Sequence, residues 1–247
     1  MRNGKGVGKI FLAAILIVAL LLAAGPGRRS KQAVSTVYPV RMPERQLILD
    51  AGHGGEDGGA VSITGVAEST INLAITLKID QILGFYGVCP ILLRDADISL
   101  HDAGADTLRK KKVSDLKSRV STIESVENGV LISVHQNTFT NPIYHGAQVF
   151  YRDTKESLAL AELTQETLRQ GLDVDNDRVP TKIPDSVYLM KHISCTAILI
   201  ECGFLSNPTE EEKLRSGSYQ TQLAVCIASA WLQSKEIQGG NPSAPVL

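Results

Sequence analysis

Residues 47–53 read Leu-Ile-Leu-Asp-Ala-Gly-His, residues 130–135 read Val-Leu-Ile-Ser-Val-His, and residues 197–201 read Ala-Ile-Leu-Ile-Glu. Each stretch is a short apolar run that ends in a residue able to hold or serve a metal ion. Such runs, bounded by Gly, Asn or Pro, predict buried strands. Because ligands bind beyond the carboxyl ends of the strands in open α/β sheets, we expect the three terminal residues to converge at one edge of a sheet.

The segments between these runs alternate between strand and helix patterns. The segment at residues 111–127 has Val113, Leu116, Val120 and Ile123 at helical spacing, on one face. Gly171 is expected to end the helix at residues 155–169. Strands are predicted at residues 46–50, 88–93, 130–134, 146–151 and 197–200, and helices at residues 68–83, 111–127, 155–169 and 219–233. This alternation predicts an α/β fold whose parallel or mixed sheet is covered on both faces.

Residues 1–27 resemble an export segment. They are basic through Lys9, apolar over residues 10–24 and end in Gly-Pro-Gly. An apolar length of about 15 residues is short for a membrane span, and small residues near its end suit cleavage, whereas the Arg pair at 28–29 favours a retained anchor. We therefore expect either a signal peptide or an N-terminal membrane anchor, with export of the rest across the cytoplasmic membrane; a buried core helix is the remaining alternative.

The remaining chain divides by composition. Residues 28–45 are rich in Arg, Lys, Ser and Pro, which predicts a linker. Residues 46–235 carry the strand and helix patterns and form the predicted folded domain, and residues 236–247 form a predicted flexible tail.

Charge and cysteine content exclude two classes of function. The formal net charge is −1, but residues 32–247 carry 19 basic and 26 acidic side chains, a net charge of −7. A domain this acidic lacks a basic footprint for nucleic acid, so we expect no nucleic-acid partner. The four cysteines are Cys89, Cys195, Cys202 and Cys226. They lack Cys-x-x-Cys spacing, which excludes zinc-finger chemistry. We expect buried free thiols as the simpler alternative, and a disulfide between two of them is the other.

Four residues could form a metal site, although each has a structural alternative. His53 could lie in a plain glycine-rich turn, and Glu68 could simply complement a helix dipole. His135 could be a structural group at a strand end. Glu201 directly continues a buried run, where an ionised carboxylate is costly unless it meets a cation or a proton. Two imidazoles and a carboxylate suit zinc, and a further carboxylate suits a general base.

Taken in order, these motifs resemble a known family. Asp-Ala-Gly-His-Gly-Gly at 50–55, Glu68, Ser-Val-His-Gln-Asn at 133–137 and Glu-Cys-Gly-Phe-Leu-Ser-Asn-Pro at 201–208 are similar to the ordered motifs of the zinc-dependent N-acetylmuramoyl-L-alanine amidases. The resemblance covers nearly the whole folded domain and implies that this domain is catalytic. It implies a single α/β domain with a twisted mixed sheet of about six strands and helices on both faces.

The resemblance also implies roles for individual residues. His53, Glu68 and His135 would bind Zn²⁺, leaving an open position where a water molecule becomes acidic. Glu201 would be the catalytic acid/base, taking the water proton and returning it to the departing amine. The bond cut would join N-acetylmuramic acid to L-alanine in peptidoglycan. Asn137 could bind the stem peptide or serve as a structural amide.

Residues 111–119, 145–151 and 187–191 look most like the germination-specific amidases of endospore-forming bacteria, which contribute to muramic-δ-lactam formation in spore cortex. This likeness implies action in the cell wall or forespore envelope. Targeting would come from the membrane, if the N-terminal segment is uncleaved, or from a protein partner that targets or activates the enzyme. Two alternatives stay open: another zinc peptidase acting within the stem peptide, and a non-catalytic peptidoglycan-binding or activator protein, against which the presence of Glu201 argues.

Three further residues are expected to stay outside the chemistry. Arg119 is expected to form a structural ion pair, because it lies on the helix before the His135 strand. His145 is not expected to be a ligand. Cys202 is a poor candidate nucleophile, because its side chain should point to the face of the sheet opposite Glu201.

Overall fold

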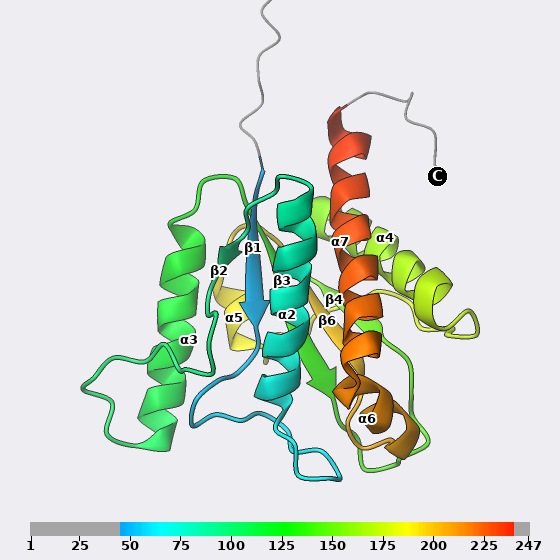
Figure 1. Ribbon diagram of the computed structural model, residues 1–247. Helices are drawn as coiled ribbons and strands as arrows, with labels where there is room; N and C mark the ends of the chain where they lie inside the picture. The colour runs from blue at the N-terminus through cyan, green and yellow to red at the C-terminus, as the bar shows by residue number, and fades with distance from the viewer. Residues whose placement is uncertain (1–44, 240–247) are drawn as a thin grey trace, which may run out of the picture. The chain divides into compact units, whose positions relative to one another are not determined.

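The computed structural model describes residues 45–239, which form one six-stranded sheet with helices on both faces (Figure 1). The strands are β1 (Gln46–Ala51), β2 (Ile91–Leu92), β3 (Gly129–Asn137), β4 (Gln148–Tyr151), β5 (Thr181–Lys182) and β6 (Thr196–Phe204). The helices are α2 (Glu68–Phe85), α3 (Leu108–Glu124), α4 (Lys155–Leu172), α5 (Tyr188–His192), α6 (Pro208–Arg215) and α7 (Gly217–Gly239). The predicted α/β domain with a mixed sheet is confirmed.

The sheet has the strand order β2-β1-β3-β6-β4-β5. β2, β1, β3 and β6 run parallel, whereas β4 is antiparallel to β6 and β5 runs parallel to β4. The register sets Ala51 beside Val134 and His135 beside Glu201. The central strands therefore end at one edge of the sheet, which is the lower edge in Figure 1, as their apolar runs predicted.

Alternate residues of the central strands enter two hydrophobic layers. Leu47 and Leu49 of β1 pack in the larger layer, beside the apolar side chains of α2, α4 and α7. Ile48 packs in the smaller layer, beside side chains of α3 and α5. Because both faces are covered, the strands are apolar on both sides, and each fully buried side chain contributes about 1.5–3 kcal/mol.

Helix α3 faces the sheet with charged side chains as well as with the later part of the predicted apolar stripe, since Ile123 is buried and Val120 packs against the smaller hydrophobic layer. Its buried residues are Asp115, Arg119 and Ile123, whereas Val113 is 44% exposed. The Arg119 guanidinium forms ion pairs with Asp50 of β1 and, at 2.7 Å, with Asp115. The expected structural ion pair of Arg119 is thus confirmed, and it attaches α3 to the sheet.

Several boundaries differ from the prediction. β3 and β6 continue past their predicted ends, so His135 and Glu201 lie within strands instead of just after them. β2 has only two residues and directly follows Pro90, which cannot donate a ladder hydrogen bond. α4 continues one residue past Gly171, to Leu172. A Cβ at Gly171 would lie 2.5 Å from the Cys226 sulfur of α7, so this glycine also allows the two helices to pack closely.

The four cysteines carry free thiols. Cys202 and Cys226 are buried and Cys195 is half-buried, but Cys89 is exposed, so the expectation of a buried thiol is wrong for that residue.

The predicted export segment lies outside the described residues, and so does nearly all of the predicted linker. Helix α7 continues to Gly239, past the predicted domain end at residue 235. Within residues 45–239, no helix is both long enough and apolar enough to cross a membrane.

Candidate active site

His53 lies in the loop that leaves β1. Its backbone φ of 63° is left-handed, which is uncommon for a residue with a side chain, and Gly54 and Gly55 also have positive φ. The imidazole Nδ1 lies 3.0 Å from Oδ2 of Asp57, and Nε2 lies 3.4 Å from Oε2 of Glu68. The Asp57 carboxylate therefore fixes the ring so that Nε2 faces Glu68.

The ring of His135 packs directly against the loop that carries His53. A Cβ at Gly52 would lie only 2.2 Å from Cε1 of His135, and the two histidine ring centroids are 5.1 Å apart. Glycine at position 52 thus allows the two imidazoles to meet.

Glu68 begins α2, and its carboxylate is surrounded by donors instead of facing solvent. Its Oε1 accepts hydrogen bonds from the Gln136 N–H and from Asn72 Nδ2, both at 3.1 Å. The same oxygen lies 3.0 Å from His135 Nδ1. Its Oε2 accepts a hydrogen bond from the Ala60 N–H at 2.9 Å. Burial raises the pKa of Glu68, but the hydrogen bond with His135 and the other contacts outweigh it and lower this pKa to about 2. The carboxylate is therefore ionised at neutral pH.

The side chains of His53, Glu68 and His135 form a group that could hold a metal ion, since their ligand atoms all lie within 4.8 Å of one another. Two imidazoles and one carboxylate are the donor set of many catalytic zinc sites, in which a fourth position stays open. The residues present therefore fit a zinc ion.

Glu201 lies beside His135 in the register of β3 and β6. Its Oε2 is buried and has no hydrogen-bond partner among residues 45–239. Burial raises the pKa of Glu201 to about 7, although the charge of His135 opposes this rise. A carboxyl group that exchanges its proton near neutral pH is suited to general acid–base chemistry.

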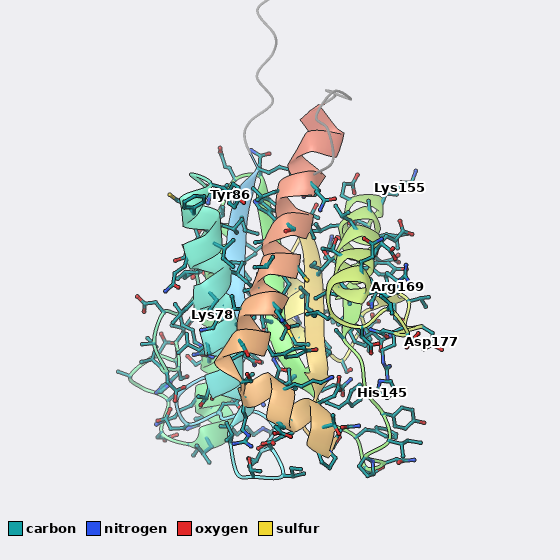
Figure 2. All side chains as sticks on the ribbon, turned by 45° about the vertical axis from the view of Figure 1, so that its right-hand side comes forward. Lys78, Tyr86, His145, Lys155, Arg169 and Asp177 are labelled. Carbon is teal, nitrogen blue, oxygen red and sulfur yellow. The ribbon has the colours of Figure 1, made fainter. Side chains whose placement is uncertain are left out.

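Within residues 45–239, the side chains of Asn137 and His145 form no hydrogen bond or ion pair with His53, Glu68 or His135. Asn137 ends β3, and its Oδ1 accepts a hydrogen bond from the N–H of the next residue at 2.8 Å, which is a local structural contact. The His145 side chain is 60% exposed and lies 3.9 Å from Asp173. Figure 2 shows His145 on the outer side of the domain, below Asp177, so it does not join His53 and His135.

The Cys202 side chain enters the hydrophobic layer on the α2 side of the sheet and is fully buried. Burial raises the pKa of the Cys202 thiol far above its ordinary value. A neutral, enclosed thiol is a poor nucleophile, which agrees with the prediction for this residue.

The sequence reasoning missed the residues that hold the cluster in place. Asp57 binds His53, and Asn72 binds Glu68 while its own Oδ1 accepts from Gln136 Nε2 at 3.1 Å. A signal for Asn72 was present, because it follows Glu68 by four residues and so lies on the same face of α2.

Comparison with known proteins agrees with the geometry. A family model of N-acetylmuramoyl-L-alanine amidases matches residues 47–233, which is most of the chain. The chain belongs to the N-acetylmuramoyl-L-alanine amidase family. This amidase is 33% identical over 197 residues to the germination-specific N-acetylmuramoyl-L-alanine amidase of Bacillus subtilis (strain 168), covering 79% of this chain and 82% of that one.

Solved structures resemble the amidase throughout its folded domain. The CwlD amidase from Clostridioides difficile, in complex with the GerS lipoprotein, is 36% identical with a TM-score of 0.75, covering 78% of this chain and 100% of that one. The amidase AmiC2 of Nostoc punctiforme is 29% identical with a TM-score of 0.65, covering 78% of this chain and 97% of that one. The mixed sheet and its helices are thus the fold of this enzyme family.

Substitution of Gly52 by Ala is expected to displace the His135 ring and to weaken zinc binding by about 10–100-fold, the range found when groups that support metal ligands are removed. Equilibrium competition with a chelator measures this change. Gly84→Ala is the matched control, because a Cβ there meets nothing within 4 Å. Equal zinc affinity in the two variants would contradict the steric role of Gly52.

Proposed function

We propose that this amidase hydrolyses the bond between N-acetylmuramic acid and L-alanine with Zn²⁺ held by His53, Glu68 and His135, and with Glu201 as the catalytic acid/base. One arrangement carries the proposal: the ligand atoms of two imidazoles and an ionised carboxylate lie within 4.8 Å of one another. Glu201, whose Oε2 has no hydrogen-bond partner in residues 45–239, lies beside His135 on the neighbouring strand. Metal-assisted amide hydrolysis needs a metal ion that activates water and a base that accepts the proton of that water. The three ligands would supply the first and Glu201 the second.

The side chains then have distinct tasks. A bound zinc ion would polarise the scissile carbonyl and lower the pKa of a water molecule. Glu201 accepts a proton from the attacking water at Oε2 and later delivers it to the amide nitrogen, which is otherwise a poor leaving group. Asp57 orients His53, and Asn72 orients Glu68, so that the ligands are held before substrate arrives.

Asn137 is proposed as a contact for the stem peptide. It lies two residues beyond His135 at the end of β3 and is only partly buried. A side-chain amide there can both donate to and accept from a peptide.

The biological substrate is proposed to be spore-cortex peptidoglycan, with hydrolysis contributing to muramic-δ-lactam formation and germination. The Bacillus relative is named as germination-specific, which supports this assignment. The Clostridioides relative was solved in complex with the GerS lipoprotein, which supports a protein partner for targeting or activation.

The proposed organisation gives the enzyme access to that substrate. Residues 1–27 serve as a signal peptide or membrane anchor, residues 28–45 as a linker, residues 46–235 as the catalytic domain and residues 236–247 as a tail. Export would deliver the catalytic domain to the cell wall or forespore envelope.

Mass spectrometry of digested peptidoglycan tests the proposed function. Zinc-loaded protein is expected to release stem peptides that begin with L-alanine, and removal of zinc by a chelator is expected to stop the release. Products cut between amino acids of the stem would instead support a zinc peptidase. An absence of new ends from zinc-loaded protein, with binding to the wall retained, would support a non-catalytic binding protein.

A further inference from the structure

Arg94 follows β2 and extends into the interior behind the candidate metal site. The residue is 2% exposed. Its Nε donates to the carbonyl of Ala51 at 2.8 Å, and its Nη1 donates to that of Ala96 at 3.0 Å. Its Nη2 donates to the carbonyls of Gly52 at 3.1 Å and Ser69 at 2.9 Å. All four acceptors are main-chain oxygens.

Two of these acceptors belong to different ligand-bearing segments. Gly52 directly precedes His53 in the loop after β1, and Ser69 directly follows Glu68 in the first turn of α2. A single nitrogen of Arg94 therefore joins the backbone that carries His53 to the backbone that carries Glu68, and Asn72 Nδ2 adds a second link by donating to the Gly52 carbonyl at 3.1 Å. The two side chains themselves meet at 3.4 Å, where a small shift of either backbone would separate them.

The chemistry of the guanidinium suits this task. Its planar fork offers five N–H groups in fixed directions and can bind several carbonyls at once, whereas a lysine ammonium is a single point. Because Arg94 is almost fully buried, its side chain is closed to substrate.

We infer that Arg94 is a positioning residue for the metal site, holding the segments of His53 and Glu68 at the spacing that a metal ion requires. The inference rests on the proposed zinc site, but it assigns a role to a residue that is neither a metal ligand nor the acid/base Glu201. Removal of the four hydrogen bonds should loosen the ligands without removing any of them.

Zinc affinity in Arg94→Lys and Arg94→Met tests this role. We expect chelator competition to show a fall of about 10-fold for Arg94→Lys, which retains one donor group, and of about 100-fold for Arg94→Met, which retains none. Arg94→Met also buries no charge, so it remains informative if Arg94→Lys fails to fold. Cobalt(II) in place of zinc adds a second readout, because its visible absorption reports ligand geometry and should change in both variants.

Ser157→Ala is the matched control for a merely structural effect. Ser157 is fully buried and accepts a hydrogen bond from the Ala197 N–H at 3.0 Å, near the start of β6 and four positions before Glu201. It should lower the urea unfolding midpoint while leaving zinc affinity and the cobalt spectrum unchanged.

The results distinguish a wrong role for Arg94 from a wrong assignment of the zinc site. If the Arg94 variants keep wild-type zinc affinity and cobalt absorption while losing stability, Arg94 is only structural and the inference is wrong. If wild-type protein binds no zinc, or if His53→Ala leaves zinc affinity unchanged, the proposed metal site itself is wrong.

Discussion

Glu201→Gln is expected to bind zinc with wild-type affinity while its turnover on purified peptidoglycan falls by roughly 10²–10⁴-fold or more, the contribution usual for a general acid–base group. The amide keeps the size of the side chain but cannot accept a proton and return it. Because the buried Oε2 has no hydrogen-bond partner among residues 45–239, the substitution should disturb little else. Turnover and metal content, measured on the same preparation, test both halves of the expectation.

Cys202→Ala provides the matched control for this experiment. Cys202 is the next residue on β6, but its side chain packs into the hydrophobic layer. Its removal should cost some stability and leave turnover intact, which also tests the thiol as a rival nucleophile. A fully active Glu201→Gln enzyme would exclude Glu201 as the base, and loss of zinc from this variant would make Glu201 a ligand instead.

The position of Glu201 was accessible from the sequence for a clear physical reason. Buried parallel strands are apolar on both faces, so the runs of β1, β3 and β6 stood out, and their polar ends marked one edge of the sheet. The pairing of His135 with Glu201 was not predicted; it comes from the structure, in which β3 and β6 are neighbouring parallel strands.

The role of Glu68 was not accessible from local pattern. An acid at a helix start is ordinarily explained by the helix dipole. What distinguishes Glu68 is its burial and its contacts with His135, Gln136 and Ala60, which depend on how the glycine-rich loop returns to the sheet. Only the resemblance to the amidase family selected this residue.

Arg94 and Arg119 show a second limit of sequence patterns. Arginines beside aspartates are typical of solvated surfaces, yet both of these guanidinium groups are 2% exposed. Their acceptors include carbonyls of Ala51 and Gly52, 42–68 positions away along the chain, which no local pattern reveals. The apolar stripe predicted for α3 identified Val120 and Ile123 on its buried face, but for the same reason it did not identify Asp115 and Arg119.

Asp50→Ala is expected to cost about 3–5 kcal/mol of folding free energy, because it leaves the buried Arg119 without one of its two carboxylates. Asp50 is 1% exposed and also accepts a hydrogen bond from Ser133 Oγ at 2.6 Å. Total stabilities of about 5–15 kcal/mol are usual, so the loss would be a large fraction of the whole. The urea unfolding midpoint at neutral pH measures it.

Ser133→Ala is the matched control, since it removes one neutral hydrogen bond from the same carboxylate and should cost only about 1 kcal/mol. Equal losses in the two variants would mean that the ion pair with Arg119 contributes little. Acid titration separates the contributions further. Burial raises the pKa of Asp50, but Arg119 outweighs burial and holds this pKa below its usual 3.8. The stabilisation by Asp50 is therefore complete above the unfolded pKa and is lost as pH falls through the folded one, so the difference between wild type and Asp50→Ala should be constant near neutrality and shrink in acid.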